Sequence, residues 1–292
     1  MRIGDKEFQT VTLSQDGAEA VLLPELGGWI ASWRAQGRDW LHPIHEHEGG
    51  HRGGCFALVP YSNRIENGRF TWNGRAVTLP PSPQAMPHSL HGTGWHRTWS
   101  VVDAAGGQAM LRLEHEGDAD WPWRFTALMT IRLAADALTL SLRMESRDAA
   151  AQPAGLGFHP FFPRRDGVSL DMATELHWVP RPDRIPVGLE PTPPALDFQG
   201  GKPLPVGLDD CLSGWNGRAR IAWTDGSALS MRADLGHALV FAPEALPYFC
   251  VEPVSHAINA LNMPDRPAVV TGLRALEPGD AWEVGVEMRI GS

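Results

Sequence analysis

Alternation of apolar and polar residues along the chain predicts β-strands, and no stretch shows a comparable helical period. In residues 125–133 apolar side chains occupy every second position, and Leu128 is the one apolar residue on the other face. The period of two resumes in residues 138–144 after a break, so the two segments are predicted to form a hairpin. Residues 282–290 alternate in the same way. We therefore expect a C-terminal strand that completes a sheet.

Glycine and proline recur along the whole length and leave little room for long helices. The chain of 292 residues holds 31 Gly and 25 Pro. The pair Asn73-Gly74 tolerates the positive φ of a type I′ turn and predicts a second hairpin. The Pro-rich segment 180–205 carries regularly placed apolar residues, which indicates a long surface excursion rather than a linker. No internal repeat is visible, so we expect one domain over residues 1–292, an all-β fold built as a large antiparallel sandwich.

Composition and charge exclude several classes of protein. Hydrophobic residues make up 43% and charged residues 20%, as in folded globular proteins. The formal charge of −9 offers no footprint for a nucleic-acid backbone. No run reaches the length of a membrane helix, and the first residues lack the apolar core of a signal peptide. The three cysteines, Cys55, Cys211 and Cys250, lie far apart, as expected in a reducing compartment, so the cytoplasm is the expected location.

Two segments combine glycines with side chains that could bind a ligand. Residues 60–65 include Arg64, whose guanidinium is suited to hydroxyls and carboxylates, although a surface Arg at a strand end is the commoner explanation. Residues 88–96 contain three histidines among glycines that would let a backbone approach a ligand closely. The alternative is a polar loop with solvated histidines.

Two further segments place one titratable residue in apolar surroundings. His159 is framed by aromatic residues, where a satisfied core histidine is the commoner explanation. Glu252 interrupts an apolar, strand-like run, and a carboxylate is seldom buried without a partner or a role. Burial would raise the pKa of Glu252 and make it a better base near neutrality.

A histidine cluster in residues 42–51 is the alternative candidate, for a metal site. His42, His45, His47 and His51 could supply ligands by number alone. Their spacing does not match a helical pair, and the adjacent acidic and Gly residues fit a solvated loop better. We therefore expect no metal, and leave this cluster as an open alternative.

Taken in order, these segments resemble the aldose 1-epimerase (galactose mutarotase) family, and in particular its shorter bacterial members. The resemblance spans most of the chain. It rests on five short motifs that are weak singly and strong in this order, namely Pro60 to Ile65 with Gly68-Arg69-Phe70, Leu90-His91-Gly92, Gly157 to Phe162, Leu208-Asp209-Asp210, and Val251-Glu252 with Asn259-Ala260.

The resemblance implies a mutarotase-type β-sandwich that interconverts the α and β anomers of a free aldose without a cofactor. A small-molecule sugar would be its partner. Glu252 looks like the general base and His159 like the general acid, a pair that can serve the two oxygens of a hemiacetal near pH 7. Substrate ligands are expected at Arg64, His91, Asp209, Asn63 and Trp95. The choice of Asp209 over Asp210 stays open.

Two departures from the family pattern bear on the sugar. Family members often have Gln where this chain has Val254, and often Tyr where it has Phe161. Two alternatives therefore remain beside a hexose mutarotase. A hexose-6-phosphate epimerase would need a basic cluster at the pocket mouth, for which Arg164-Arg165 is the adjacent basic pair near a motif. A non-catalytic sugar-binding protein would keep the sandwich without turnover.

Overall fold

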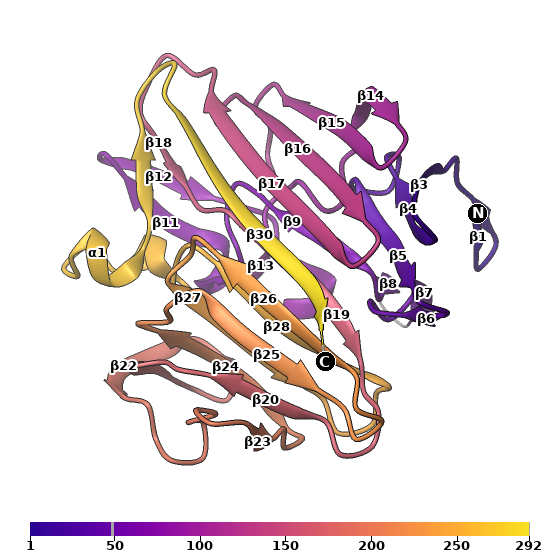
Figure 1. Ribbon diagram of the computed structural model, residues 1–292. Coiled ribbons are helices and arrows are strands. Elements are labelled where there is room, and N and C mark those ends of the chain that lie inside the picture. The colour runs from indigo at the N-terminus through magenta and orange to yellow at the C-terminus, as the bar shows by residue number, and fades with distance from the viewer. Residues whose placement is uncertain (48–49, 292) are drawn as a thin grey trace.

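Two large antiparallel sheets form the body of the protein. The computed structural model describes residues 1–47 and 50–291. In Figure 1 the nine-stranded sheet lies in front, and strands of the second sheet are visible behind it. The order of the first sheet is β14 (Ser100–Ala105), β15 (Gln108–His115), β16 (Phe125–Ala134), β17 (Ala137–Ser146), β30 (Ala281–Gly291), β26 (Ala228–Ala233), β25 (Arg218–Ala222), β20 (Ser169–Met172) and β23 (Lys202–Pro203).

The second sheet contains the strands that carry most of the motif residues. Its order is β22 (Pro186–Pro191), β21 (Leu176–Pro180), β24 (Leu208–Ser213), β27 (His237–Ala242), β28 (Tyr248–Val254), β19 (Gly157–Pro163), β9 (Cys55–Leu58), β5 (Trp29–Ala35), β4 (Ala18–Leu23) and β3 (Val11–Gln15), with β6 (Arg38–Asp39) paired to β5. The all-β sandwich predicted from the sequence is confirmed.

Shorter elements connect and flank the two sheets. Pairs of short strands are β1 (Arg2–Ile3) with β2 (Lys6–Glu7), β7 (His45–His47) with β8 (Gly50–Arg52), β10 (Arg64–Ile65) with β13 (Ser89–Leu90), β11 (Arg69–Trp72) with β12 (Arg75–Thr78), and β18 (Gln152–Ala154) with β29 (Arg274–Leu276). The helical elements described are three 3-10 turns and one short α-helix, at Glu66–Gly68, Pro83–Ala85, Ala260–Asn262 and α1 (Ala268–Thr271).

Both predicted hairpins are present. β16 pairs with β17 from Phe125↔Ser146 to Ala134↔Ala137. β11 and β12 are joined by Asn73 and Gly74, both with positive φ (47° and 78°), as a type I′ turn requires. The C-terminal strand β30 lies inside its sheet, between β17 and β26, rather than at an edge. The Pro-rich segment supplies β22 and β23, which lie at outer positions of the two sheets.

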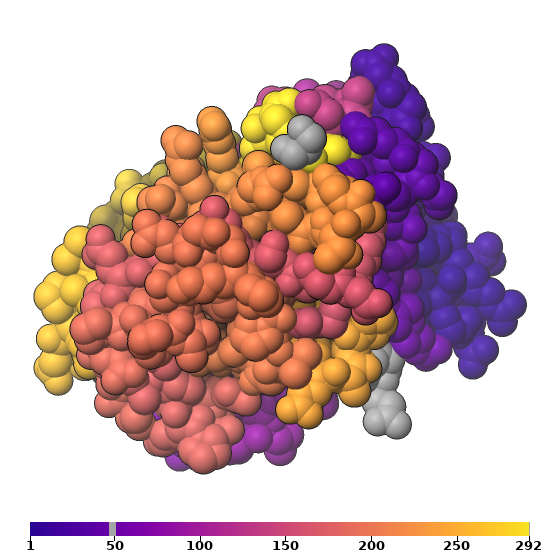
Figure 2. Space-filling model, turned by 60° about the horizontal axis from the view of Figure 1, so that its bottom comes forward, coloured from indigo at the N-terminus to yellow at the C-terminus, as the bar shows by residue number. Residues whose placement is uncertain are grey.

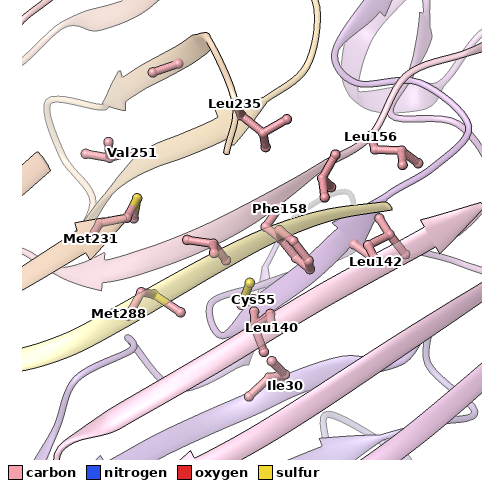
Figure 3. Packing of buried hydrophobic residues seen from close by; sticks show 14 of the residues in the cluster. Ile30, Cys55, Leu140, Leu142, Leu156, Phe158, Met231, Leu235, Val251 and Met288 are labelled. Atoms are coloured by element: carbon pink, nitrogen blue, oxygen red, sulfur yellow. The ribbon is translucent and has the colours of Figure 1, made fainter. Parts of the chain in front are cut away.

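The space between the two sheets is filled by alternating side chains from both. Figure 3 shows Leu140 and Leu142 of β17 and Met288 of β30 in one layer with Phe158 of β19 and Val251 of β28. Burying such side chains is the main stabilising contribution to the fold. Because neighbouring residues on a strand point to opposite faces, residues next to these on β19 and β28 lie on the other face of the second sheet.

Candidate active site

The candidate site lies on the face of the second sheet that is turned away from the first. Phe158 and Val251 point to the core between the sheets, so their neighbours His159 and Glu252 point outward. β19 and β28 are adjacent strands in the sheet interior, which brings these two side chains together. His159 Nε2 lies 3.2 Å from Glu252 Oε1. A second buried cluster of apolar residues surrounds them on this face.

The imidazole of His159 packs against two aromatic rings. Phe56 on β9 is the register partner of His159, and its ring stacks on the imidazole at 4.6 Å between centroids. Phe161, two residues further along β19, stacks at the same centroid distance. Phe161, at the position where Tyr is expected from the resemblance, is therefore one of the two aromatic side chains that fix the orientation of the imidazole. Both rings also exclude water from the imidazole.

Burial favours the uncharged forms of both members of the pair. Glu252 is only 2% exposed, and burial raises the pKa of its carboxyl, as does the nearby charge of Asp209. Burial lowers the pKa of His159, and the charge of Arg52 lowers it further. Glu252 Oε2 and His159 Nδ1 are buried without a hydrogen-bond partner. The sequence argument for a raised Glu252 pKa thus agrees with the structure.

Asn63 and His91 hold each other by two hydrogen bonds. The backbone N–H of Asn63 donates to His91 Nδ1 at 3.1 Å, and the N–H of His91 donates to the carbonyl of Asn63 at 3.0 Å. Both residues have positive φ, which places the contact at two tight bends. Burial lowers the pKa of His91, so its ring is neutral and, with Nδ1 accepting, carries its proton on Nε2. His91 is thereby a hydrogen-bond donor at Nε2.

The structure separates the two adjacent aspartates. Asp209 lines the same pocket as Glu252, and its Oδ2 lies 3.6 Å from Arg64 Nη2 and 3.4 Å from Arg184 Nε. Asp210, on the other face of β24, accepts a hydrogen bond from His177 at 2.9 Å instead. Asp209 is therefore the aspartate that faces the site.

Every residue predicted to take part in catalysis or sugar binding lines one pocket. It contains about 720 Å³ of empty space, including the open mouth. Its lining combines aromatic side chains with a few polar and charged groups, as small-molecule sites do. Its lining consists of Trp29, Arg52, Phe56, Asn63, Arg64, Gln84, Leu90, His91, Trp95, His159, Phe161, Asp209, Phe241 and Glu252.

Other residues near the motifs have structural rather than ligand-facing positions. His88 Nδ1 accepts from the N–H of Asn67, and Asn259 Oδ1 accepts from the N–H of Glu66. His96 stacks on Trp95. These contacts fix the loops that carry the pocket residues.

The basic pair Arg164-Arg165 does not line this pocket. Arg165 donates to the carbonyl of Asp39 and lies over the ring of Trp223, and Arg164 lies over Phe249. The expectation that this pair could form a basic cluster at the pocket mouth is therefore wrong, because both guanidinium groups lie over aromatic rings outside the pocket. Arg52 and Arg184, which sequence reasoning missed, are the basic residues added at the site.

The described residues include one group that could hold a metal ion, formed by His159, Cys250 and Glu252. Their ligand atoms lie within 4.8 Å of one another. Burial raises the pKa of the Cys250 thiol well above its usual range, so a metal would have to displace that proton. In the other cluster, His42 and His45 have ring centroids 5.1 Å apart, and the side chain of His47 lies outside the described residues.

Comparison with known proteins agrees with the pattern of motifs. The profile described as aldose 1-epimerase matches residues 9–289. An uncharacterised protein of Escherichia coli K12, YphB, is 31% identical over 248 residues, covering 81% of this chain and 83% of its own length. The aldose 1-epimerase of the same organism is 29% identical over 131 residues, which is 44% of this chain and 37% of that protein.

Solved structures share the fold. A candidate aldose 1-epimerase from Escherichia coli K12 has a TM-score of 0.87 at 28% identity, covering 97% of this chain and 99% of its own. A galactose mutarotase-like protein from Clostridium acetobutylicum has a TM-score of 0.84 at 16% identity, covering 98% and 96%, and supports the fold alone. With this fold and a profile match over nearly its whole length, the chain belongs to the aldose 1-epimerase family.

Proposed function

We propose that the protein is an aldose 1-epimerase, an isomerase that interconverts the α and β anomers of a free hexose such as galactose or glucose. The observation that carries this proposal is the contact between Glu252 Oε1 and His159 Nε2 at 3.2 Å, in a pocket that every residue expected to bind the sugar also lines. Ring opening needs a base for one oxygen and an acid for its neighbour, and this pair offers both.

The form of the pair that reacts is the charged one, in which the single shared proton has moved from Glu252 to His159; burial makes this form the less populated one. Glu252 takes the proton of the anomeric hydroxyl as the C1–O5 bond breaks, and His159 gives its proton to the ring oxygen. The lone pair left on O1 forms the C1=O1 carbonyl. After rotation about C1–C2, the hydroxyl O5 attacks the other face of the carbonyl and both protons return. Atoms and charge balance without a covalent intermediate.

Burial makes this exchange favourable in the opening direction. Ring opening converts a carboxylate and an imidazolium into a neutral acid and a neutral imidazole, which are the forms that the buried site favours. Burial therefore strengthens Glu252 as a base and His159 as an acid. Each positioned group would contribute roughly 10²- to 10⁴-fold to the rate.

The remaining pocket residues would hold the sugar. His91 presents a donor at Nε2, Arg64 presents guanidinium donors, and Asp209, next to Arg64, presents acceptor oxygens. Asn63 positions His91 and lines the pocket beside it. Trp95 supplies an aromatic surface on which the C–H face of a sugar can stack.

Polarimetry on freshly dissolved α-galactose and α-glucose tests the proposal. We expect the wild-type protein to accelerate mutarotation, and Glu252→Gln to lose most of that acceleration. Glu283→Gln, an exposed carboxylate change on β30, is the matched control and should retain the wild-type rate. Equal rates for the wild type and Glu252→Gln would contradict the assigned base.

A non-catalytic sugar-binding protein is the other outcome of this test. It would bind galactose or glucose saturably in calorimetry and leave mutarotation at the uncatalysed rate.

The choice of hexose is part of this proposal, because the relatives establish the family and not the sugar. A cytoplasmic location also belongs to it, supported by three buried free thiols. No helix among the described residues is long and apolar enough to cross a bilayer.

A further inference from the structure

Arg52 is a cation in the pocket without an acidic partner among the described residues. It ends strand β8 and pairs in register with His45 on β7. Its Nη1 donates to the carbonyl of His51 at 3.0 Å. The other two guanidinium groups at the site, on Arg64 and Arg184, lie against the carboxylate of Asp209. No ion pair that involves Arg52 is formed within residues 1–47 and 50–291.

The site therefore carries a surplus of positive charge. Arg52 and Arg64 line the pocket and Arg184 contacts Asp209 from outside the lining, so three guanidinium groups accompany two carboxyl groups, on Asp209 and Glu252. Burial also raises the pKa values of both carboxyl groups, which reduces their negative charge. The chain as a whole has a formal charge of −9, so the positive charge at the site is opposite in sign to the net charge of the protein. A half-buried cation of this kind is stabilised when a ligand brings an anion.

Arg52 lies on the His159 side of the reacting pair. After burial, the charge of Arg52 is the next cause that lowers the pKa of His159, whereas the charges acting on Glu252 come from Asp209 and Arg64. The sheet order agrees with this placement. In the second sheet β19 lies between β28, which carries Glu252, and β9, and the carbonyl of Gly54, two residues after Arg52, accepts a hydrogen bond from the N–H of Phe161 on β19 at 2.9 Å.

This placement corresponds to a particular part of the sugar. In the proposed reaction His159 serves the ring oxygen, which is bonded to C1 and to C5 of the hexose. Glu252 serves the hydroxyl on C1. A side chain beyond His159, away from Glu252, is therefore next to the substituent on C5.

We propose that Arg52 binds an acidic group on the C5 substituent of the substrate, so that the pocket selects aldoses bearing a carboxylate or a phosphate there. This inference rests on the proposed function. A planar guanidinium offers two parallel donors to either anion, and hydrogen bonds to charged groups are about twice as strong as neutral ones. Carboxylate and phosphate share this chemistry, and the test separates them.

The test compares mutarotation of galacturonate, glucuronate, galactose 6-phosphate and glucose 6-phosphate with that of galactose and glucose. Uncatalysed rates are subtracted for each sugar. The readout is the ratio of kcat/KM for the acidic sugar to kcat/KM for its neutral parent, in the wild type, Arg52→Gln and Arg52→Lys. Arg220→Gln, an exposed arginine on β25 in the first sheet, is the matched control.

We expect a wild-type ratio well above one for the uronates or for the phosphates, and a loss of about 10- to 100-fold in that ratio for Arg52→Gln. Arg52→Lys should restore part of it, and Arg220→Gln should leave it unchanged. Higher ionic strength should lower the ratio in the wild type, because salt screens the attraction. A ratio near or below one in the wild type, or equal losses for acidic and neutral sugars in Arg52→Gln, would overturn the proposal.

Failure of the proposed function gives a different result. In that case no sugar is accelerated, neutral or acidic. Calorimetric titration of galacturonate, galactose 6-phosphate and galactose then decides the role of Arg52. Tighter binding of an acidic sugar that is lost in Arg52→Gln supports it, and equal binding of the three sugars contradicts it.

Discussion

Gly155→Ala tests how the core of the second sheet positions the site. A Cβ at Gly155 would lie 2.0 Å from Cδ2 and 2.2 Å from Nε2 of the buried His256 ring. That Nε2 accepts a hydrogen bond from the backbone N–H of Ser62 at 3.0 Å, immediately before Asn63 and Arg64. The φ of Gly155 is not positive, so alanine fits the backbone and the clash with the ring is the whole perturbation.

The magnitude follows from the contacts that must change. An ordinary contact of about 3.4 Å requires the ring to move by more than 1 Å, which breaks its bond to Ser62. Leaving a buried donor and acceptor unpaired costs about 1–3 kcal/mol each, so we expect a loss of roughly 2–6 kcal/mol in the free energy of unfolding. We also expect lower kcat/KM for mutarotation, because the loop carrying Arg64 shifts.

Urea unfolding measures the loss of stability. The control is Gly236→Ala, where a Cβ meets no atom within 4 Å and φ is also not positive. In a His256→Ala background, Gly155→Ala should cost far less, since the clashing ring is absent. Additive losses in Gly155→Ala/His256→Ala, or a loss in Gly155→Ala no larger than in the control, would refute the argument from this contact.

Three further predictions concern the pocket. The rate of mutarotation should follow a bell-shaped pH profile, since the Glu252/His159 pair must hold one proton. The acid limb should lie below pH 6.5, because the pKa of His159 is lowered, and the alkaline limb above the usual carboxyl pKa, because the pKa of Glu252 is raised. A rate that does not change with pH would contradict this assignment. Arg184→Gln should raise KM by about 3- to 10-fold, measured by initial rates, as Asp209 loses one of its two cations; an unchanged KM would contradict a role in sugar binding. Trp95→Leu should raise KM by about 2- to 10-fold with little change in kcat, and a fall in kcat alone would argue against sugar stacking.

The residues that lie on regular strands were predictable from the sequence. The alternation that predicts a strand also places Glu252 on the face opposite Val251, and the same holds for His159 and Phe158. The hairpin turn at Asn73 was predictable because its φ is a local property of the Asn-Gly pair. The roles of Glu252 and His159 in catalysis remain predictions that the mutarotation assay tests.

The residues that reach the site from loops and outer elements were not predictable. Arg184 lies in the Pro-rich excursion at a position with φ of 70°, and its contact with Asp209 depends on how that segment folds over the sheet. Arg52 directly follows residues 42–51, whose histidines were considered as metal ligands, and nothing in that pattern indicates an arginine that lines the pocket. No spacing rule relates either arginine to the motif residues, because both contacts are set by tertiary packing.

The reacting pair and two of the residues expected to bind the sugar lie on different kinds of element. Figure 2 shows segments from the second half of the sequence covering one face, with the N-terminal strands to one side. Glu252 and His159 sit on adjoining strands that are bonded on both flanks, whereas Asn63 and His91 belong to bends. Bends tolerate insertions and substitutions better than interior strands do. Related proteins can therefore change their sugar specificity through the bends while Glu252 and His159 stay the same. Engineers seeking altered selectivity should accordingly randomise the bends and leave the two strands intact.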